Sequence, residues 1–362
     1  MARKSRSSSL IQANVLRDLR AAKSEWSRRL FQLPVEGSAA LDVSRTRSSA
    51  ASRTVVRAIT PVPTENVVGV GVGEKIADGK HTGIWAVRFF VRHKFPEAQL
   101  TAKTRLPKTV NGLPVDVEES GLFRRFGARA LRRVSEVATP NPRIKIRPAP
   151  PGSSVGFKDP ANQIVMAGTF GALVSDKAGS YILSNNHVLA DENRLPVGSP
   201  IFQPGLLDDN NAAANQIAEF TRDVQLQAAT PNQVDCAIAK VLKTSSVTNQ
   251  ILTIGSPQGI TDAQIDMTVH KFGRTSSYSV GRVTSVDTDV TVQYETGNYT
   301  FTGQMIVVGL NGQPFSAAGD SGSLILERPE NRAVGLLFAG SASHTIANHI
   351  GDVLQALQVT LA

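Results

Sequence analysis

The chain contains very little cysteine: Cys236 is the only one in 362 residues, so no disulfide can form within the chain. It also lacks an apolar run long enough for a membrane-spanning helix, and no apolar signal-peptide core follows Met1. The absence of long apolar runs predicts a protein with no membrane partner. Cys236 lies in an apolar strand pattern, which favours a small buried residue over a reactive thiol.

Cofactor and metal motifs are absent too. Gly69, Gly71 and Gly73 spell G-x-G-x-G, which is neither the dinucleotide fingerprint nor a phosphate loop ending in Lys-Ser/Thr. Strand glycines that allow close backbone packing explain this pattern better. No two histidines stand at the helical spacing of metal ligands. We therefore expect neither a metal nor a cofactor.

Positive charge is unevenly distributed, although the chain as a whole carries +9. The net charge is +8 over residues 1–57, +1 over 58–120, +7 over 121–150 and −7 over 151–362. Interleaved Arg and Phe at 123–126 would suit stacking on nucleic acid, but an acidic C-terminal part disfavours a nucleic-acid partner. We expect instead that basic segments contact the acidic domain of the same chain or remain solvated.

Sequence patterns divide the chain into four parts. Residues 1–58 form a basic N-terminal helix, expected over 10–33, and a linker. Residues 59–120 have the strand and turn signals of a small α+β accessory domain, and 121–162 form a basic Arg/Pro-rich connector. In residues 163–362 short apolar runs alternate with Gly, Asn and Asp turns, which is typical of all-β barrels. The size of this last part suits a double β-barrel.

Three short motifs in the β-rich part carry the chemistry. His187 lies in Leu-Ser-Asn-Asn-His-Val, Asp235 follows 48 residues later in Val-Asp-Cys-Ala-Ile, and Ser321 another 86 residues later in Gly-Asp-Ser-Gly-Ser. A serine hydroxyl needs a base within hydrogen-bond reach, and a buried carboxylate can hold an imidazole in the required tautomer. The order predicts a Ser-His-Asp site with His187 as base, Asp235 as orienting acid and Ser321 as nucleophile.

Two details of this site follow from its neighbours in the sequence. Gly319 permits a backbone conformation that points the amides of Gly319 and Ser321 into one oxyanion hole. The acid is the least constrained assignment, because Asp208, Asp209 and Asp223 also lie between the histidine and the serine. These three stand in polar loops, where a solvated carboxylate needs no partner, so Asp235 is favoured.

The motifs resemble those of the chymotrypsin-fold serine peptidases over roughly residues 163–362. Residues 184–188 are similar to the histidine motif of the HtrA-type branch, and 319–322 to the trypsin form. Together with Gln203-Pro204-Gly205 and residues 234–239, they are similar to the bacterial and plant trypsin-like peptidases that include the plant NARROW LEAF type. This resemblance implies an all-β, chymotrypsin-like double β-barrel, here preceded by the α+β domain and the N-terminal helix.

The resemblance also bears on location. Secreted relatives usually carry several disulfides, so a single cysteine favours a reducing, cytoplasmic setting. An Arg/Ser-rich, acid-poor start resembles a transit peptide, which leaves import into an organelle as the alternative.

The substrate pocket departs from that of trypsin. Trypsin has an aspartate six residues before the serine, where it binds a basic side chain, and this chain has Phe315 there. The facing strand, residues 336–340, is apolar throughout. The sequence predicts a pocket for small or apolar side chains, formed by Phe315, Phe338, Ala339 and Gly340.

Asp320 needs a partner of its own. In trypsin relatives that partner is an amino terminus released by cleavage before Ile-Val. An Ile164-Val165 pair exists here, but it follows Gln163 rather than Lys or Arg. An internal hydrogen-bonding partner is therefore favoured.

We expect a serine endopeptidase that acts on a limited set of intracellular proteins or peptides. Deleting residues 1–57 should then raise its activity and weaken the dependence of that activity on salt. The alternatives are a catalytically inactive scaffold that binds peptides or nucleic acid, and an acyl hydrolase that uses the same triad on esters.

Overall fold

The computed structural model describes residues 2–33, 60–77, 80–125, 140–159 and 164–362. They belong to two compact units, Met1–Gly121 and Leu122–Ala362. The linker expected at 35–58 lies outside the described residues.

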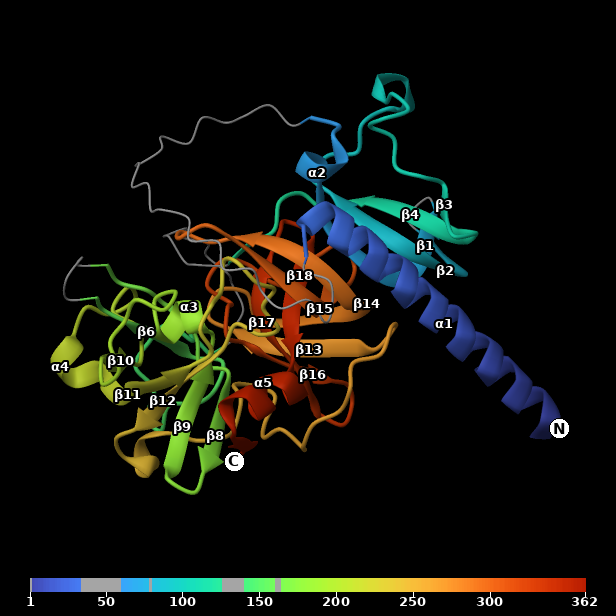
Figure 1. The fold of residues 1–362 in the computed structure, drawn as a ribbon. Coiled ribbons are helices and arrows are strands. Elements are labelled where there is room, and N and C mark those ends of the chain that lie inside the picture. The colour runs from blue at the N-terminus through green and yellow to red at the C-terminus, as the bar shows by residue number, and fades with distance from the viewer. Residues whose placement is uncertain (1, 34–59, 78–79, 126–139, 160–163) are drawn as a thin grey trace. The chain divides into compact units, whose positions relative to one another are not determined.

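The first unit combines one long helix with a small mixed sheet (Figure 1). Helix α1 (Ala2–Phe31) begins earlier in the chain than the predicted helix over 10–33. Strand β1 (Val67–Ala77), which contains the G-x-G-x-G pattern, pairs antiparallel with β2 (Lys80–Val91). β2 pairs in parallel with β4 (Leu113–Glu119). The shorter elements are α2 (Pro63–Asn66), η1 (Glu97–Gln99) and β3 (Thr109–Val110).

One face of α1 forms the core of this unit with the sheet. Leu19 and Ala22 are fully buried, as are Val70 of β1 and Phe89 of β2. The Trp26 ring meets the Phe89 ring edge-on, with 5.2 Å between centroids. The helical spacing of apolar residues thus does predict the buried face, because side chains three and four residues apart share one side of a helix.

The second unit contains an open, eight-stranded sheet in the order β19-β8-β9-β12-β11-β10-β6-β7. Most neighbours are antiparallel hairpin or meander partners, so side chains alternate between the two faces and one face packs into an apolar cluster around Phe157, Phe170 and Phe220. Its strands are β6 (Ser154–Phe157), β7 (Gly168–Thr169), β8 (Ala172–Asp176), β9 (Gly179–Ser184), β10 (Pro200–Phe202), β11 (Gln216–Asp223), β12 (Ala237–Val241) and β19 (Thr360–Leu361). Strand β6 lies within the segment that the sequence suggested as connector.

Six further strands of the second unit close into an antiparallel barrel, in the ring order β13-β14-β15-β18-β17-β16 and back to β13. They are β13 (Thr268–Gly273), β14 (Ser277–Gln293), β15 (Asn298–Gly309), β16 (Leu324–Glu327), β17 (Ala333–Gly340) and β18 (His344–His349). The two-residue strand β5 (Arg124–Arg125) pairs with β14 and β17. The remaining elements are α3 (Asn186–Leu189), α4 (Ala212–Asn215), η2 (Thr244–Ser246) and α5 (Ile350–Leu357).

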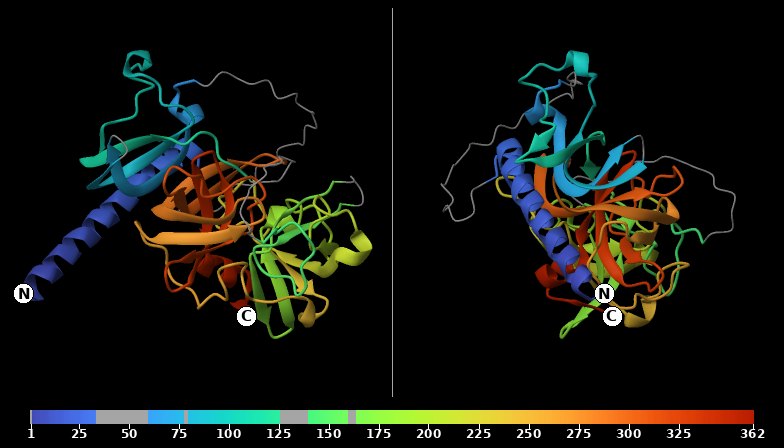
Figure 2. Two further views of the ribbon diagram at one scale, coloured as in Figure 1. Left: turned by 180° about the vertical axis from the view of Figure 1, so that it is seen from behind. Right: turned by 90° about the vertical axis from the view of Figure 1, so that its right-hand side faces the viewer.

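The open sheet and the barrel lie side by side, as Figures 1 and 2 show from several directions. An apolar cluster joins them: Val174 and Leu183 of the open sheet pack in the same cluster as Leu324 and Leu336 of the barrel. The segments after β9 and before β12 in the open sheet, and before β16 in the barrel, carry His187, Asp235 and Ser321. The candidate site is built from those segments.

Candidate active site

His187 is placed by a short helix that follows β9. The chain leaves β9 at Ser184, Asn185 has an extended backbone at the helix N-cap, and His187 lies in the first turn of α3. The Asn185 side-chain amide donates to the Asp235 carbonyl at 2.8 Å, which ties this turn to the segment before β12. The His187 side chain is completely buried.

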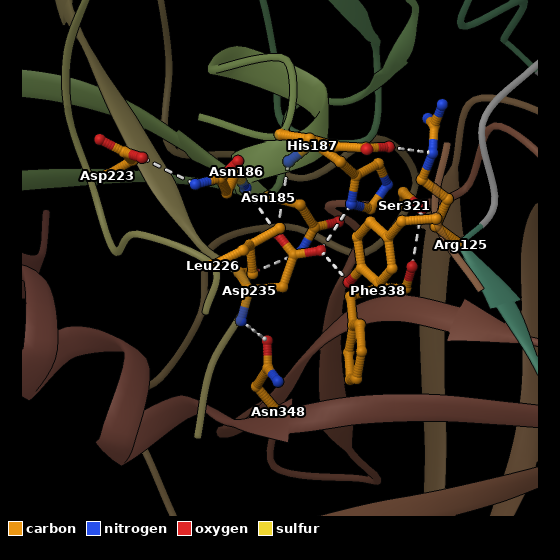
Figure 3. Close-up of polar contacts among 12 residues, drawn as sticks. Arg125, Asn185, Asn186, His187, Asp223, Leu226, Asp235, Ser321, Phe338 and Asn348 are labelled. Carbon is orange, nitrogen blue, oxygen red and sulfur yellow. Dashed lines mark hydrogen bonds and ion pairs between the residues drawn. The ribbon is translucent and has the colours of Figure 1, made fainter. Parts of the chain in front are cut away.

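The carboxylate of Asp235 orients that imidazole (Figure 3). Its Oδ2 lies 2.6 Å from Nδ1 of His187. Its Oδ1 accepts the backbone amide of Asn186 at 2.7 Å and, more weakly, that of His187 at 3.4 Å. One carboxylate therefore holds both the ring and the backbone of the histidine turn. Because both carboxylate oxygens accept hydrogen bonds, the free-energy cost of burying this fully buried aspartate is offset.

Two residues that sequence reasoning missed complete the surroundings of Asp235. The Tyr294 hydroxyl donates to Asp235 Oδ2 at 2.6 Å, and the Asn348 side chain accepts the Asp235 amide at 3.0 Å. Burial, followed by the nearby Asp235 charge, raises the pKa of Tyr294 well above its ordinary value. Tyr294 therefore stays protonated and acts as a hydrogen-bond donor. No local signal marks either residue, because each lies in a different strand or turn of the barrel.

The other three aspartates have different partners. Asp208 forms an ion pair with Arg274, with 2.6 Å between Oδ1 and the terminal nitrogen. Asp209 accepts the Asn215 side-chain amide at 3.0 Å. Asp223 accepts the Asn186 side-chain amide at 2.7 Å, and burial raises its pKa. Among the predicted carboxylates, only Asp235 contacts the imidazole.

Ser321 lies in the loop between β15 and β16, two residues after Gly319. Gly319 has a φ of 99°, in the left-handed region that glycine tolerates, and its carbonyl accepts the Thr169 hydroxyl at 3.0 Å. Within the described part of the chain, neither the Gly319 amide nor the Ser321 amide has a hydrogen-bond acceptor. Two such amides, one on the serine itself and one two residues before it, are the donors that a tetrahedral oxyanion would need.

The Ser321 hydroxyl does not donate to the histidine in this structure. It donates to the Phe338 carbonyl at 3.2 Å, and His187 Nε2 has no partner among the described residues. His187, Asp235 and Ser321 all have no solvent-exposed surface. The expected hydrogen bond between the serine and its base is thus not formed in this structure, where the hydroxyl donates to a backbone carbonyl instead. Figure 3 shows His187 and Ser321 on the same side of the site.

Asp320 has an internal partner, as the sequence favoured. Lys271 Nζ lies 3.2 Å from its Oδ2, and both side chains are completely buried. The Ser276 hydroxyl and the backbone amides of Thr275, Ser276 and Ala317 also donate to the Asp320 carboxylate. Burial alone would raise the pKa of Asp320, but Lys271 and these hydrogen bonds outweigh it, so the pKa lies below the ordinary value. The loop that carries Ser321 is thereby fixed to β13.

The residues predicted to form the substrate pocket separate into two groups. Phe315 is buried in the barrel core, with its ring 5.5 Å from Lys271 Nζ. The Phe338 ring packs on Phe301, with 4.7 Å between centroids. Ala339 and Gly340 pair with β5. Phe338 therefore contacts the serine and Ala339 and Gly340 follow it along β17, whereas Phe315 lies within the barrel interior.

Cys236 is fully buried in the cluster between the two sheets, and burial raises the pKa of its thiol well above the ordinary value. The described residues contain no group of three or more His, Cys, Asp or Glu side chains that could hold a metal ion. None of the described helices has both the length and the apolar character needed to cross a membrane.

The paired sheets of the second unit form a chymotrypsin-like double β-barrel architecture, with one closed barrel and one open sheet, and the fold class predicted from the sequence is confirmed. A family model described as the Nal1 C-terminal domain matches residues 223–350. No curated protein matches the chain.

Solved structures of serine proteases are similar to part of the chain. A glutamic-acid-specific serine protease with a histidine triad in substrate binding is 18% identical, with a TM-score of 0.41, over 59% of this chain and 100% of that one. Protease A of Thermobifida fusca is 16% identical, with a TM-score of 0.42, over 59% and 97%. A chymotrypsin of Cellulomonas bogoriensis is 18% identical, with a TM-score of 0.37, over 54% and 90%.

Proposed function

We propose that this chain is a serine endopeptidase, with Ser321 as nucleophile, His187 as general base and Asp235 as the group that orients the base. The proposal depends chiefly on one observation. A completely buried imidazole has its Nδ1 held 2.6 Å from a carboxylate, while its Nε2 has no partner in the described part of the chain. A ring held in this way presents one basic nitrogen for proton transfer.

The reaction requires Ser321 to leave its present hydrogen bond. Rotation about χ1 would move the hydroxyl from the Phe338 carbonyl toward His187 Nε2. The oxygen then attacks the substrate carbonyl carbon, and its proton passes to Nε2 as the Gly319 and Ser321 amides bind the oxyanion. The imidazolium returns the proton to the leaving amine as the C–N bond breaks. Water, activated by the same histidine, then hydrolyses the acyl-enzyme.

Protein or peptide substrates, a pocket for small or apolar side chains, and a reducing cytoplasmic setting are parts of the same proposal. The chain's own pairing of a peptide segment with β17 supports a peptide rather than a small ester as substrate. The location rests on the single cysteine, which is buried.

A fluorophosphonate probe tests the proposal, because it reacts with an activated serine and leaves ordinary serines unlabelled. We expect labelling of the native chain and none of Ser321→Ala, with Ser323→Ala as a matched control on a neighbouring buried serine. A proteome-wide cleavage profile then separates an endopeptidase from an esterase. A native chain that folds but takes up no label, even after long incubation, would refute the proposal.

A second candidate is a catalytically inactive scaffold with the same fold. It is favoured by two observations: the serine hydroxyl donates to a backbone carbonyl, and no atom of the triad side chains is exposed. The same labelling experiment decides between the two, since a scaffold would bind peptides without reacting with the probe.

A further inference from the structure

The short strand β5 lies along the edge of β17 that leads to the serine. Arg125 is opposite Ala339 and Arg124 is opposite Gly340, in antiparallel register. On the other side of the segment, the Phe123 carbonyl accepts the Gln293 amide at 3.1 Å. The residue before Ala339 is Phe338, whose carbonyl accepts the Ser321 hydroxyl. An extended piece of chain therefore pairs with β17 at the residue next to Phe338, whose carbonyl contacts the proposed nucleophile.

The side chain of Arg125 enters an acidic site beside this edge. Its Nε lies 2.6 Å from an oxygen of Glu192, and a terminal nitrogen contacts Glu295. The Arg125 side chain is only 6% exposed and that of Glu192 only 1%. A planar guanidinium binds two carboxylates through directional hydrogen bonds as well as through its charge. A lysine ammonium group does not reproduce this geometry. Figure 3 shows Arg125 extending from the β5 segment next to Ser321.

Groups other than the arginine also hold Glu192. Its carboxylate accepts the Thr296 amide at 2.9 Å, the Thr296 hydroxyl at 2.6 Å and the Glu295 amide at 3.2 Å. Three consecutive residues, Asp191, Glu192 and Asn193, have positive φ values of 50°, 54° and 71°. Non-glycine residues keep such a backbone only where the surroundings impose it, and runs of this kind are concentrated at functional sites. The backbone conformation at residues 191–193 and the hydrogen bonds from residues 295–296 thus hold the Glu192 carboxylate in place.

We infer that the β17 edge, with Glu192 and Glu295, is a peptide-binding subsite that selects an arginine, and that β5 occupies this subsite in the present state. Main-chain pairing supplies the affinity of such a site and the acidic pair supplies its selectivity. A peptide bound in place of β5 would place the residue after its arginine opposite Phe338, by the same register. The carbonyl of that residue would then be the one presented to Ser321. The assignment of the attacked bond rests on the proposed function, whereas the subsite itself does not.

Two consequences follow for substrates. Substrates carry an arginine one residue before the residue whose carbonyl is attacked. The attacked residue itself, directly after the arginine, is apolar or small. The chain's own β5 competes with them, so that the site is blocked until this segment is displaced. The triad side chains have no exposed surface, in agreement with a blocked site.

Peptide binding to the full-length chain tests the inference without requiring catalysis. Fluorescent peptides Phe-Arg-Arg-Phe and Phe-Arg-Ala-Phe are titrated against Ser321→Ala and against Ser321→Ala/Arg125→Ala, with anisotropy as the readout. We expect the first peptide to bind the double variant about tenfold more tightly than the second, as for one charge-assisted arginine contact. We also expect Arg125→Ala to increase the affinity for that peptide severalfold, because the competing side chain is removed.

A further substitution, made in both Ser321→Ala and Ser321→Ala/Arg125→Ala, tests which side chain gives the preference for arginine. Glu295→Gln, at a side chain that is 45% exposed and tolerant of change, should reduce the preference for the arginine peptide severalfold. Glu219→Gln, at an exposed position on β11, should leave the preference unchanged. Equal affinity for the two peptides, or a preference that Glu295→Gln does not alter, would overturn the subsite. Selective binding by a chain that never reacts with fluorophosphonate would instead refute the proposed hydrolysis and leave the subsite standing.

Discussion

The buried Lys271–Asp320 pair provides a sharp test of how the serine loop is held. Lys271→Met keeps most of the side-chain volume but leaves the Asp320 carboxylate buried without its cation, 3.2 Å from where the ammonium was. Removing one partner of a buried ion pair costs about 3–5 kcal/mol. For a unit of this size, each kcal/mol lowers Tm by about 2–4 °C, so we expect a drop of about 6–20 °C.

The pH dependence of this loss has a definite sign. In the native chain the pKa of Asp320 is below its ordinary value of 3.8, so its stabilising contribution is present above that value and is lost as the pH falls through the lower, folded value. Without Lys271, burial is less opposed and raises the pKa of Asp320. Protonation then relieves the buried charge, and the difference in stability from the native chain should shrink as the pH falls from 7 toward 4.5.

Thermal unfolding followed by circular dichroism across this pH range measures both effects. Lys240→Met, at an exposed lysine on β12, serves as the matched control and should change stability by no more than about 0.5 kcal/mol. The double variant Lys271→Met/Asp320→Asn should recover part of the loss, because no unpaired charge remains. A loss below about 1 kcal/mol, or one that grows as the pH falls, would refute the reasoning.

Three further predictions concern the site. Tyr294→Phe removes the hydroxyl that donates to Asp235 at 2.6 Å but keeps the ring, so we expect a loss of about 1.5–3 kcal/mol in chemical denaturation and slower hydrolysis. Asp235→Asn should leave the fold intact and slow hydrolysis about 10⁴-fold, because the tautomer of His187 is no longer held, and an unchanged rate would contradict that role. Gly322→Ala places a Cβ 2.0 Å from the Ser184 hydroxyl oxygen at a φ of 90°, whereas Gly198→Ala has the same φ with open space around it. Gly322→Ala should therefore destabilise the chain by clearly more than Gly198→Ala, and equal losses in thermal unfolding would rule out the steric explanation.

Local sequence signals predicted much of the framework. The apolar spacing in the N-terminal helix identified the face that buries Leu19 and Ala22. Alternating apolar residues and turn signals identified strands in the accessory domain and the barrels. These signals act between residues close in the chain, so one sequence suffices to recognise them. The beginning of α1 at Ala2 and the strand β6 within the proposed connector were not predicted, because weak local propensity is overridden by pairing partners elsewhere.

The candidate triad was selected from the order and the immediate context of three motifs. The apolar context of residues 234–238 favoured Asp235 over the other aspartates, and its carboxylate contacts the imidazole. The expectation that those others are solvated loop carboxylates is wrong for Asp208, whose side chain is 7% exposed and pairs with Arg274, and for Asp223, which ends strand β11. The hydrogen-bond partner of the serine hydroxyl was beyond such reasoning. Whether the Ser321 hydroxyl points to Phe338 or to His187 depends on which acceptors the folded barrel brings near it.

The sequence by itself determined which residues could perform the chemistry and the β-rich framework that carries them, because both depend on residue types in short, ordered motifs. Only the tertiary structure decided what surrounds them. Lys271 meets Asp320 across 49 residues, Tyr294 meets Asp235 across 59, and Arg125 meets Glu192 from a segment with no matching local signal. Charged and polar side chains acquire such partners through the closure of the barrel, and the free energy of burying them without a partner explains why these pairs form.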